Sequence, residues 1–475
     1  MDPVRPERVF QGMWRLPTWR PQRGVPGTLT LSGDRARLEL DGTLLTTKRL
    51  RESVLGPERP GVVPRILGAT EDGKTLVTLE RCDLAGRSDS SSVFIGRTQR
   101  DRYWPRVICL GGWFAQGEPL AFDWLGIWLT SLHAWTAISG FERDWSRRQR
   151  GMRRTTVYEP PRTCRATLHD GTRVQLSFPL KETGDTTLFP REKTLRQDTR
   201  FELTFREPQE LEYVQRLVLA LRNLVTLGVA ESVTVEKLIG YRTSGDPQDP
   251  RFSREVELIY AHVENPDAED APHHHEMLFT LSDFGGAFRK HVLRWMALTT
   301  ELGLVLTHYF STLHISTQYL ETDFLNYVQG VEGYHRRRLN RTTYPPKVFE
   351  EYSTLILADV TGGPRRLAKR ALRWANEVSL EERIRDVVDR AGVAGVEIVR
   401  AGGTSADEFA RTVAGARNDM AHALDKPGPS GLELLRLSYQ LKALIEAVLL
   451  IELGFSDERA HEMLSHARRF RRIRG

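Results

Sequence analysis

The segment Arg417-Asn418-Asp419-Met420-Ala421-His422 places side by side the residue types that cleave RNA without a metal ion. A histidine titrates near neutrality, so it can take the proton of a ribose 2′-hydroxyl. An arginine stays charged and can stabilise the negative charge that grows on the attacked phosphate, while an asparagine can orient either side chain. These six residues can therefore form an active site.

The bare pattern, an Arg followed by four to six residues and then a His, is a weak indicator, because the chain contains it three times. Arg162 with His169 falls in a segment that alternates like a strand, and Arg459 with His466 falls in an amphipathic, Arg-rich helix. The third match differs in its Asn directly after the Arg, its Ala directly before the His and its helical surroundings. A structural alternative stays open, in which Arg417 and His422 cap a helix end and pair with carboxylates.

The motif lies in a predicted helix that opens at Ser405 and buries Phe409, Val413 and Ala416. At about 100° per residue, Arg417 and His422 are about 140° apart, so they do not share one helix face. The helix bends or ends inside the motif, or the Arg side chain reaches round, or a second copy supplies the facing half. We favour the second copy, since a twofold axis beside the motif would bring two Arg-His pairs around one phosphate.

The pattern of the chain changes near residue 275, which predicts an α+β protein of two domains. Residues 1–275 show short alternating runs, as at 27–31, 35–40, 173–178 and 200–205, and predict an antiparallel β-sandwich-like domain that carries one helix over 208–227. Pro208 is expected in the first turn of that helix. Residues 276–475 predict a helical bundle, with capping boxes at Ser379, Ser405 and Ser430 and a long apolar helix over 432–453.

Composition and charge narrow the class of protein. No apolar run approaches the roughly 20 residues that cross a bilayer, no signal peptide is evident, and three unpatterned cysteines suit a reducing compartment, so we expect a cytoplasmic protein without membrane contact. The net charge of +6 is mild, but Arg and Lys gather in clusters. We expect RNA to contact the cations of the helical half that are listed here: Arg337, Arg365, Arg366, Lys369 and Arg370.

His273, His274 and His275 raise the question of a metal site. Consecutive side chains are expected to point in different directions, whereas metal ligands must converge. No Gly-rich phosphate-binding loop is present either. We therefore expect neither a metal ion nor a cofactor.

The Arg-Asn-x-x-x-His hexad, the preceding segment Glu332-Gly333-Tyr334-His335-Arg336 and the apolar helix that ends at Leu453-Gly454 resemble the HEPN ribonuclease superfamily. The segments Trp14-Arg15-Leu16-Pro17 and Val25-Pro26-Gly27-Thr28-Leu29 narrow the resemblance to ApeA-like anti-phage proteins. The resemblance implies an endoribonuclease of abortive infection, which cuts host or phage RNA, with tRNA as one substrate class. It further implies a homodimer or higher oligomer and a phage-encoded trigger.

Carried over to this chain, the resemblance makes Arg417 and His422 the catalytic pair and Asn418 the polar partner of the arginine. Glu332, His335 and Arg336 are accessory candidates, although a cluster at a helix end is more often a surface or interface feature. The N-terminal domain would be the sensor or specificity module. Two alternatives stay open: a non-catalytic dimeric HEPN-type binding protein, and a regulatory partner of a nucleotidyltransferase.

Overall fold

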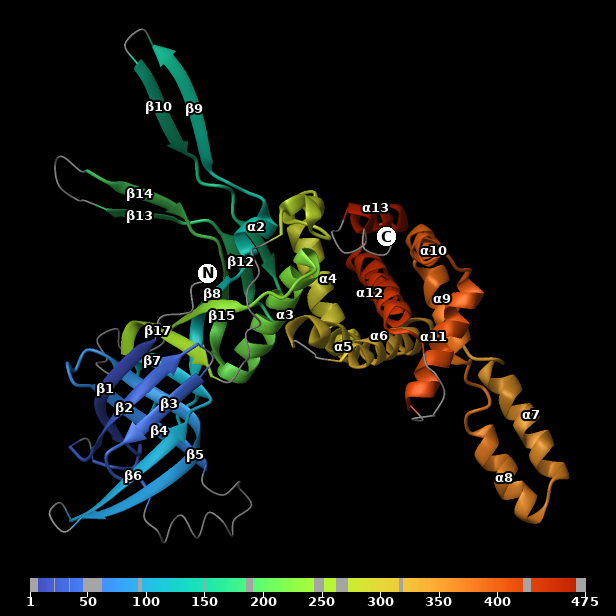
Figure 1. Cartoon of the computed structure of the whole chain (residues 1–475), viewed down its shortest axis with the longest axis horizontal. Coiled ribbons are helices and arrows are strands. Elements are labelled where there is room, and N and C mark those ends of the chain that lie inside the picture. The colour runs from blue at the N-terminus through green and yellow to red at the C-terminus, as the bar shows by residue number, and fades with distance from the viewer. Residues whose placement is uncertain are drawn as a thin grey trace. The chain divides into compact units, whose positions relative to one another are not determined.

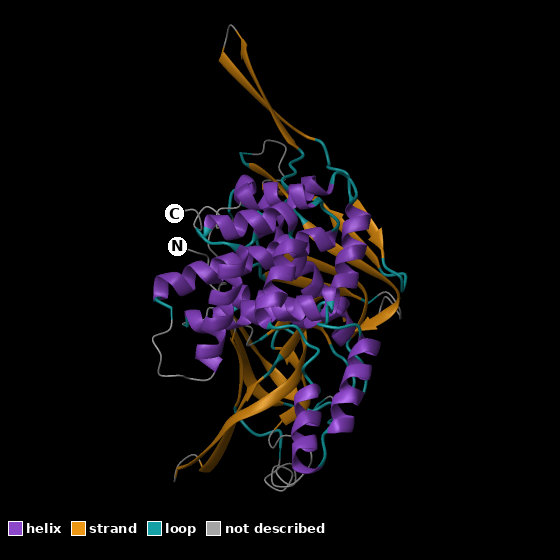
Figure 2. Ribbon diagram, turned by 90° about the vertical axis from the view of Figure 1, so that its right-hand side faces the viewer, coloured by secondary structure: helices purple, strands orange, loops and turns teal. Residues whose placement is uncertain are grey.

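The structure is a computed structural model that describes residues 7–20, 22–33, 35–45, 62–92, 96–148, 151–184, 191–242, 252–261, 272–315, 319–421 and 429–466. Two compact units make up the chain: residues 1–225 with 233–271, and residues 226–232 with 272–475. Strands dominate the first unit and helices the second. Figure 2 draws the strands in orange and the helices in purple. The predicted α+β class is confirmed.

Six consecutive strands close into an antiparallel barrel at the start of the chain (Figure 1). They are β1 (Arg8–Arg15), β2 (Val25–Ser32), β3 (Arg35–Leu40), β4 (Val62–Thr70), β5 (Leu76–Ser92) and β6 (Gly96–Trp104). Strand β5 pairs with β4 on one side and with β6 on the other, which completes the ring. Ala36, Leu38 and Leu40 alternate with more exposed residues along β3 and point to the barrel core. The predicted antiparallel β-rich domain is confirmed, and its first six strands form a barrel.

The sheet continues from β5 through further antiparallel strands to a total of thirteen. These are, in order across the sheet, β7 (Val107–Gly112), β17 (Phe252–Tyr260), β16 (Val235–Tyr241), β8 (Ala121–Leu129), β15 (Arg200–Glu210), β12 (Arg173–Ser177) and β11 (Cys164–Thr167). Two separate hairpins, β9 (Phe141–Arg148) with β10 (Gly151–Tyr158) and β13 (Leu180–Gly184) with β14 (Lys193–Gln197), extend from this unit (Figure 1). A short helix, α2 (Leu132–Thr136), follows β8.

Helix α3 spans Leu211–Val229 and buries Val214, Leu221 and Leu224. Its predicted start at Pro208 is wrong, because strand β15 runs on to Glu210. The register of β15 against β8 shifts between Thr204 and Gln209. Such an irregularity accommodates a proline, which has no N–H to donate to a sheet. The helix then begins after the proline rather than with it.

The second unit is helical, as predicted. Its elements are the turns η1 (His274–Glu276), η2 (Leu281–Phe284) and η3 (His335–Leu339), and the helices α4 (Phe288–Glu301), α5 (Gly303–His314), α6 (Leu320–Tyr334), α7 (Pro346–Asp359), α8 (Gly362–Leu372), α9 (Leu380–Arg390), α10 (Gly392–Ala401), α11 (Ala406–Ala421), α12 (Gly431–Leu453) and α13 (Asp457–His466). Among the described residues, no helix combines the length and apolar character that a membrane span requires.

Helix α12 is the centre of this unit and packs against α4, α6, α9, α10 and α13. Its predicted apolar stripe is buried, from Leu434 through Leu441 and Leu444 to Val448. The three predicted helix starts are also correct. Ser379, Ser405 and Ser430 each accept a hydrogen bond at the side-chain oxygen from the backbone N–H three residues on, at 3.2 to 3.3 Å. These caps fix where α9, α11 and α12 begin.

Candidate functional site

Helix α11 carries the first part of the Arg-His motif near its C-terminal end. Phe409, Val413 and Ala416 are buried on one side of this helix, which packs against α9 and α6. Arg417 follows the buried Ala416 and is half-buried, whereas Asn418 is exposed. His422 lies outside the described residues, so the predicted pairing of Arg417 with His422 stays a prediction.

Arg417 carries a charge that no carboxylate of the described chain neutralises. Its guanidinium donates one hydrogen bond, to Oδ1 of the adjacent Asn418 at 3.2 Å. Asn418 therefore contacts the adjacent arginine, and its role in a site stays a prediction. The alternative interpretation, in which Arg417 pairs with a carboxylate, finds no such pair among the residues that the structure describes. A half-buried, unneutralised guanidinium beside an amide can bind a phosphate oxygen.

The accessory candidates lie where α6 ends. His335 begins the π-helical turn η3 and is fully buried. Its Nε2 lies 2.8 Å from Oδ2 of Asp386, and its Nδ1 lies 3.2 Å from Nη1 of Arg383. A guanidinium can only donate, so Nδ1 accepts and the ring proton resides on Nε2, which donates to Asp386. Burial lowers the pKa of His335, which favours this neutral form.

Glu332 and Arg336 join the same network from the surface side. Arg336 contacts Glu332 at 3.1 Å and Glu377 at 2.7 Å. Glu377 also accepts a hydrogen bond at 2.8 Å from Arg383, whose side chain is almost fully buried. The three accessory candidates are therefore linked through Glu377 and Arg383. No hydrogen bond or ion pair joins them to Arg417 within the described residues.

Sequence reasoning missed Glu377, Arg383 and Asp386. The capping box at Ser379 predicts the helix that holds Arg383 and Asp386, and their spacing of three residues places them on one face of it. Charged residues at such spacing are usually solvated, so this signal alone does not distinguish a buried network from a surface face. The contact with His335 identifies them.

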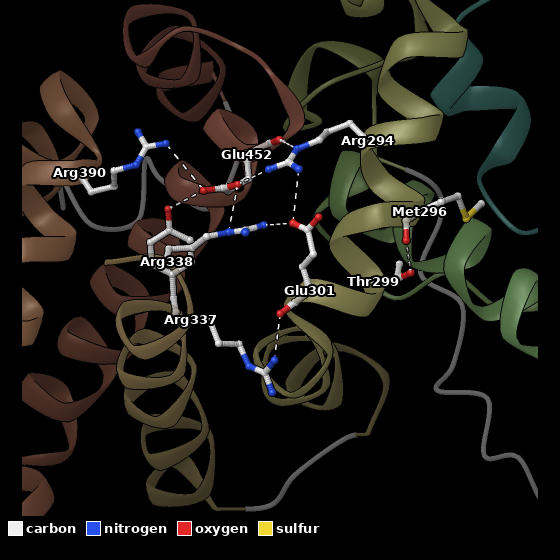
Figure 3. A network of polar contacts seen from close by, with 9 residues as sticks. Arg294, Met296, Thr299, Glu301, Arg337, Arg338, Arg390 and Glu452 are labelled. Atoms are coloured by element: carbon white, nitrogen blue, oxygen red, sulfur yellow. Dashed lines mark hydrogen bonds and ion pairs between the residues drawn. The ribbon is translucent and has the colours of Figure 1, made fainter. Parts of the chain in front are cut away.

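A second ionic network holds the turn η3 in place (Figure 3). Glu452, at the buried end of α12, lies 2.6 Å from Arg294, 3.3 Å from Arg338 and 3.7 Å from Arg390. Arg294 and Arg338 also contact the carboxylate of Glu301, and the hydrogen bond from Arg338 holds the pKa of Glu301 below its ordinary value. These contacts join α4, η3, α9 and α12. They fix the backbone that carries His335 and Arg336.

The predicted RNA contacts fall on η3 and on helix α8. Arg337 is exposed and donates to the backbone carbonyl of Glu301 at 3.0 Å. Arg365 donates to the carbonyls of Leu357 and Val360, so it caps the end of α7. The remaining cations of α8 are exposed and make no ion pair with a described residue: Arg366, Lys369 and Arg370. These three side chains are free to meet a polyanion.

Helices α7 and α8 form a hairpin that contains no buried residue. Its base is closed by Asn376, which donates to the carbonyl of Tyr344 at 3.0 Å and accepts from its N–H at 2.8 Å. The next residue, Glu377, forms a β-bridge with Thr342. Because Glu377 also binds Arg336 and Arg383, the base of the basic hairpin is attached directly to the His335 network.

The three consecutive histidines correct one expectation. One ring nitrogen from each of His273, His274 and His275 lies within 4.8 Å of the others, so the side chains converge instead of diverging. All three are exposed, and three ligands at zinc distances of about 2.0–2.1 Å need buried partners to hold them. The absence of a metal site in this protein stays a prediction.

Comparison with known protein families covers both units. Residues 9–295 match the family described as ApeA N-terminal domain 1, and residues 325–459 match the family described as Apea-like HEPN. The second match spans the accessory candidates and the whole Arg-His motif. No curated protein and no solved structure matches the chain. HEPN domains are generally associated with ribonucleases and often act as dimers. The first of these matches alone covers more than half of the chain. The chain therefore belongs to the ApeA family of anti-phage HEPN proteins.

Proposed function

We propose that this protein is a metal-independent endoribonuclease that cleaves RNA during phage infection. One observation carries the proposal: the Apea-like HEPN match includes Arg417, and the described chain supplies no carboxylate to neutralise it. An arginine that no described carboxylate neutralises is available to an anionic substrate. The family match and the sequence of the motif add His422 as its partner.

The proposed reaction needs only the groups of the motif. His422 takes the proton of a ribose 2′-hydroxyl, and the 2′-oxygen attacks the adjacent phosphorus. The bond from phosphorus to the 5′-oxygen of the next nucleotide breaks, which leaves a 2′,3′-cyclic phosphate and, after protonation, a 5′-hydroxyl. Arg417 stabilises the added negative charge on the phosphate oxygens, and Asn418 holds the guanidinium through its 3.2 Å contact.

Two features of the proposal concern the assembly. On one continuous helix, Arg417 and His422 would be about 140° apart, so one copy would not present both on a single face. A homodimer with its twofold axis at the end of α11 places two motifs around one substrate phosphate. The cations of α8 extend the positive surface along the RNA strand, and Arg337 and Arg365 contribute to the same field.

The proposal is tested by incubating purified full-length protein with total RNA, with EDTA present, alone and with extract from phage-infected cells. We expect fragments that end in 2′,3′-cyclic phosphate and 5′-hydroxyl. Fragments with 3′-hydroxyl and 5′-phosphate ends, or cleavage that EDTA abolishes, would contradict the mechanism. Absence of cleavage under both conditions would favour a non-catalytic binding protein.

A further inference from the structure

The β-rich unit contains a cavity of about 460 Å³ between helix α3 and the strands β16 and β17. Arg8 of β1 and Leu31 of β2 lie at its border. Its volume falls within the range of about 300–1,000 Å³ that is usual for small-molecule sites. Much of the lining is apolar and comes from Val218, Leu238 and Leu258. The cavity is therefore large enough and apolar enough to bind an organic molecule.

Arg222 of α3 lines this cavity and has no anionic partner among the residues that the structure describes. Its guanidinium donates only to the adjacent Asn223, over distances of 3.3 and 3.4 Å, and no described carboxylate pairs with it. Burial lowers its pKa to about 10. A largely buried cation without a counterion is costly to the fold, because the solvation that it loses is not replaced. Such a residue suggests that the counterion is a ligand.

The other polar groups around the cavity do not neutralise Arg222. The hydroxyl of Tyr260, on β17, is buried and so is not open to the cavity. Burial raises the pKa of Tyr260, so the group stays protonated and carries no charge. The carboxylates of the lining are already engaged: Glu257 accepts two hydrogen bonds from Arg8, at 2.9 and 3.0 Å, and Glu236 has an interaction of its own.

The cavity thus offers one cation that no described carboxylate neutralises, beside an apolar wall. We propose that it binds a small organic anion, in which one carboxylate or phosphate group is joined to an apolar body. Arg222 pairs with the anionic group, and the side chains of Val218, Leu238 and Leu258 cover the apolar part. This site is independent of the proposed ribonuclease site and lies in the other unit of the chain.

The test is isothermal titration of the full-length protein with octanoate, octyl phosphate and octanol. We expect one of the two anions to bind with one-to-one stoichiometry and at least about tenfold more tightly than octanol, because a charged hydrogen bond contributes that much. The tighter anion identifies the headgroup as a carboxylate or a phosphate. If octanol binds as tightly as both anions, or if none of the three binds, the proposal is wrong.

Two variants and one control assign the effect to the cavity. Arg222→Met should weaken binding of the anion at least about tenfold while its thermal midpoint stays equal or rises, since it removes an uncompensated charge. Arg216→Met, an exposed position on the same helix outside the cavity, should leave binding unchanged. Arg222→Lys keeps a cation at the position, so it should retain more of the affinity for the anion than Arg222→Met does, and it serves as the second variant if Arg222→Met does not fold. Equal effects of Arg222→Met and Arg216→Met, or full affinity for octanol with no preference for either anion in the Arg222→Lys protein, would overturn the assignment.

Discussion

Arg383 donates a hydrogen bond to Nδ1 of His335 across 3.2 Å, and this contact fixes the buried imidazole in its neutral form. The opposite ring nitrogen then serves as a donor to Asp386. His335 consequently acts as a connector between η3 and α9 rather than as a free acid or base. Among the histidines proposed for the site, His422 is the one left to carry the proton transfer.

The first prediction concerns the pH dependence of stability. Burial lowers the pKa of His335 in the folded state, so as pH falls the unfolded chain binds a proton before the folded chain does. The stability that His335 contributes is complete above about pH 6.5, the ordinary pKa, and falls below it by up to about 1.4 kcal/mol per pH unit.

Urea unfolding of the wild type and of His335→Gln between pH 8 and pH 5.5 measures this effect. The variant is a necessary reference, because burial also lowers the pKa of His291 and both proteins retain that residue. The difference in unfolding free energy between the two proteins should shrink as pH decreases. A difference that grows toward low pH would mean that His335 is charged in the folded protein.

The second prediction concerns Glu377, which holds two arginines at once. Glu377→Gln leaves the nearly buried Arg383 without its carboxylate and leaves Arg336 paired with Glu332 alone. Losing one partner of a largely buried pair costs about 2–4 kcal/mol, which chemical denaturation of the full chain should detect. Asp389→Asn, on the exposed side of α9, is the matched control and should change stability by less than about 0.5 kcal/mol. Equal effects of the two substitutions would show that the network adds nothing to stability.

The third prediction separates RNA binding from catalysis. The triple variant Arg366→Gln, Lys369→Gln and Arg370→Gln removes the unpaired cations of α8. Its affinity for single-stranded RNA should fall, and the slope of log K against log salt concentration should decrease by up to about 2, since each phosphate contact contributes about 0.7. Fluorescence anisotropy at several salt concentrations measures both quantities.

A control with the same loss of charge separates a specific contact surface from the effect of net charge. The control replaces three exposed arginines of the β-rich unit with glutamine and so also removes three cations: Arg162, Arg206 and Arg216. This triple variant should change the salt slope little. If both triple variants reduce affinity equally, net charge alone attracts RNA and α8 is not a specific contact surface.

Local rules predicted the helical unit well because each helix start depends on neighbouring residues. Ser379 and Glu382 complete a capping box whatever the rest of the chain does. Closure of the barrel is different, since it requires β5 to pair with both β4 and β6, and no local pattern records a pairing of that kind. Pro208 was misplaced for a related reason: a proline suits a helix start, but the shifted register against β8 keeps it in a strand.

The candidate site was predictable only in part. The motif around Arg417 is contiguous in the sequence, so its residue types indicate the chemistry directly. The partners of His335 come from α9, about 50 positions along the chain, and only the packing of α9 on η3 brings Asp386 to its ring. Arg222 gave no signal either, because a single arginine in an amphipathic helix is usually solvated, and its burial depends on the strands around it.

The most direct test of the catalytic proposal compares three arginine and histidine substitutions in one RNA cleavage assay, with EDTA present. Arg417→Ala and His422→Ala should each reduce cleavage by at least about a hundredfold and leave the thermal midpoint within a few degrees of the wild type. Arg411→Ala, an exposed arginine on the same helix, should cleave like the wild type. Cyclic-phosphate ends made by the wild type and by Arg411→Ala alone would establish Arg417 and His422 as the catalytic pair. Undiminished cleavage by Arg417→Ala or by His422→Ala would contradict it.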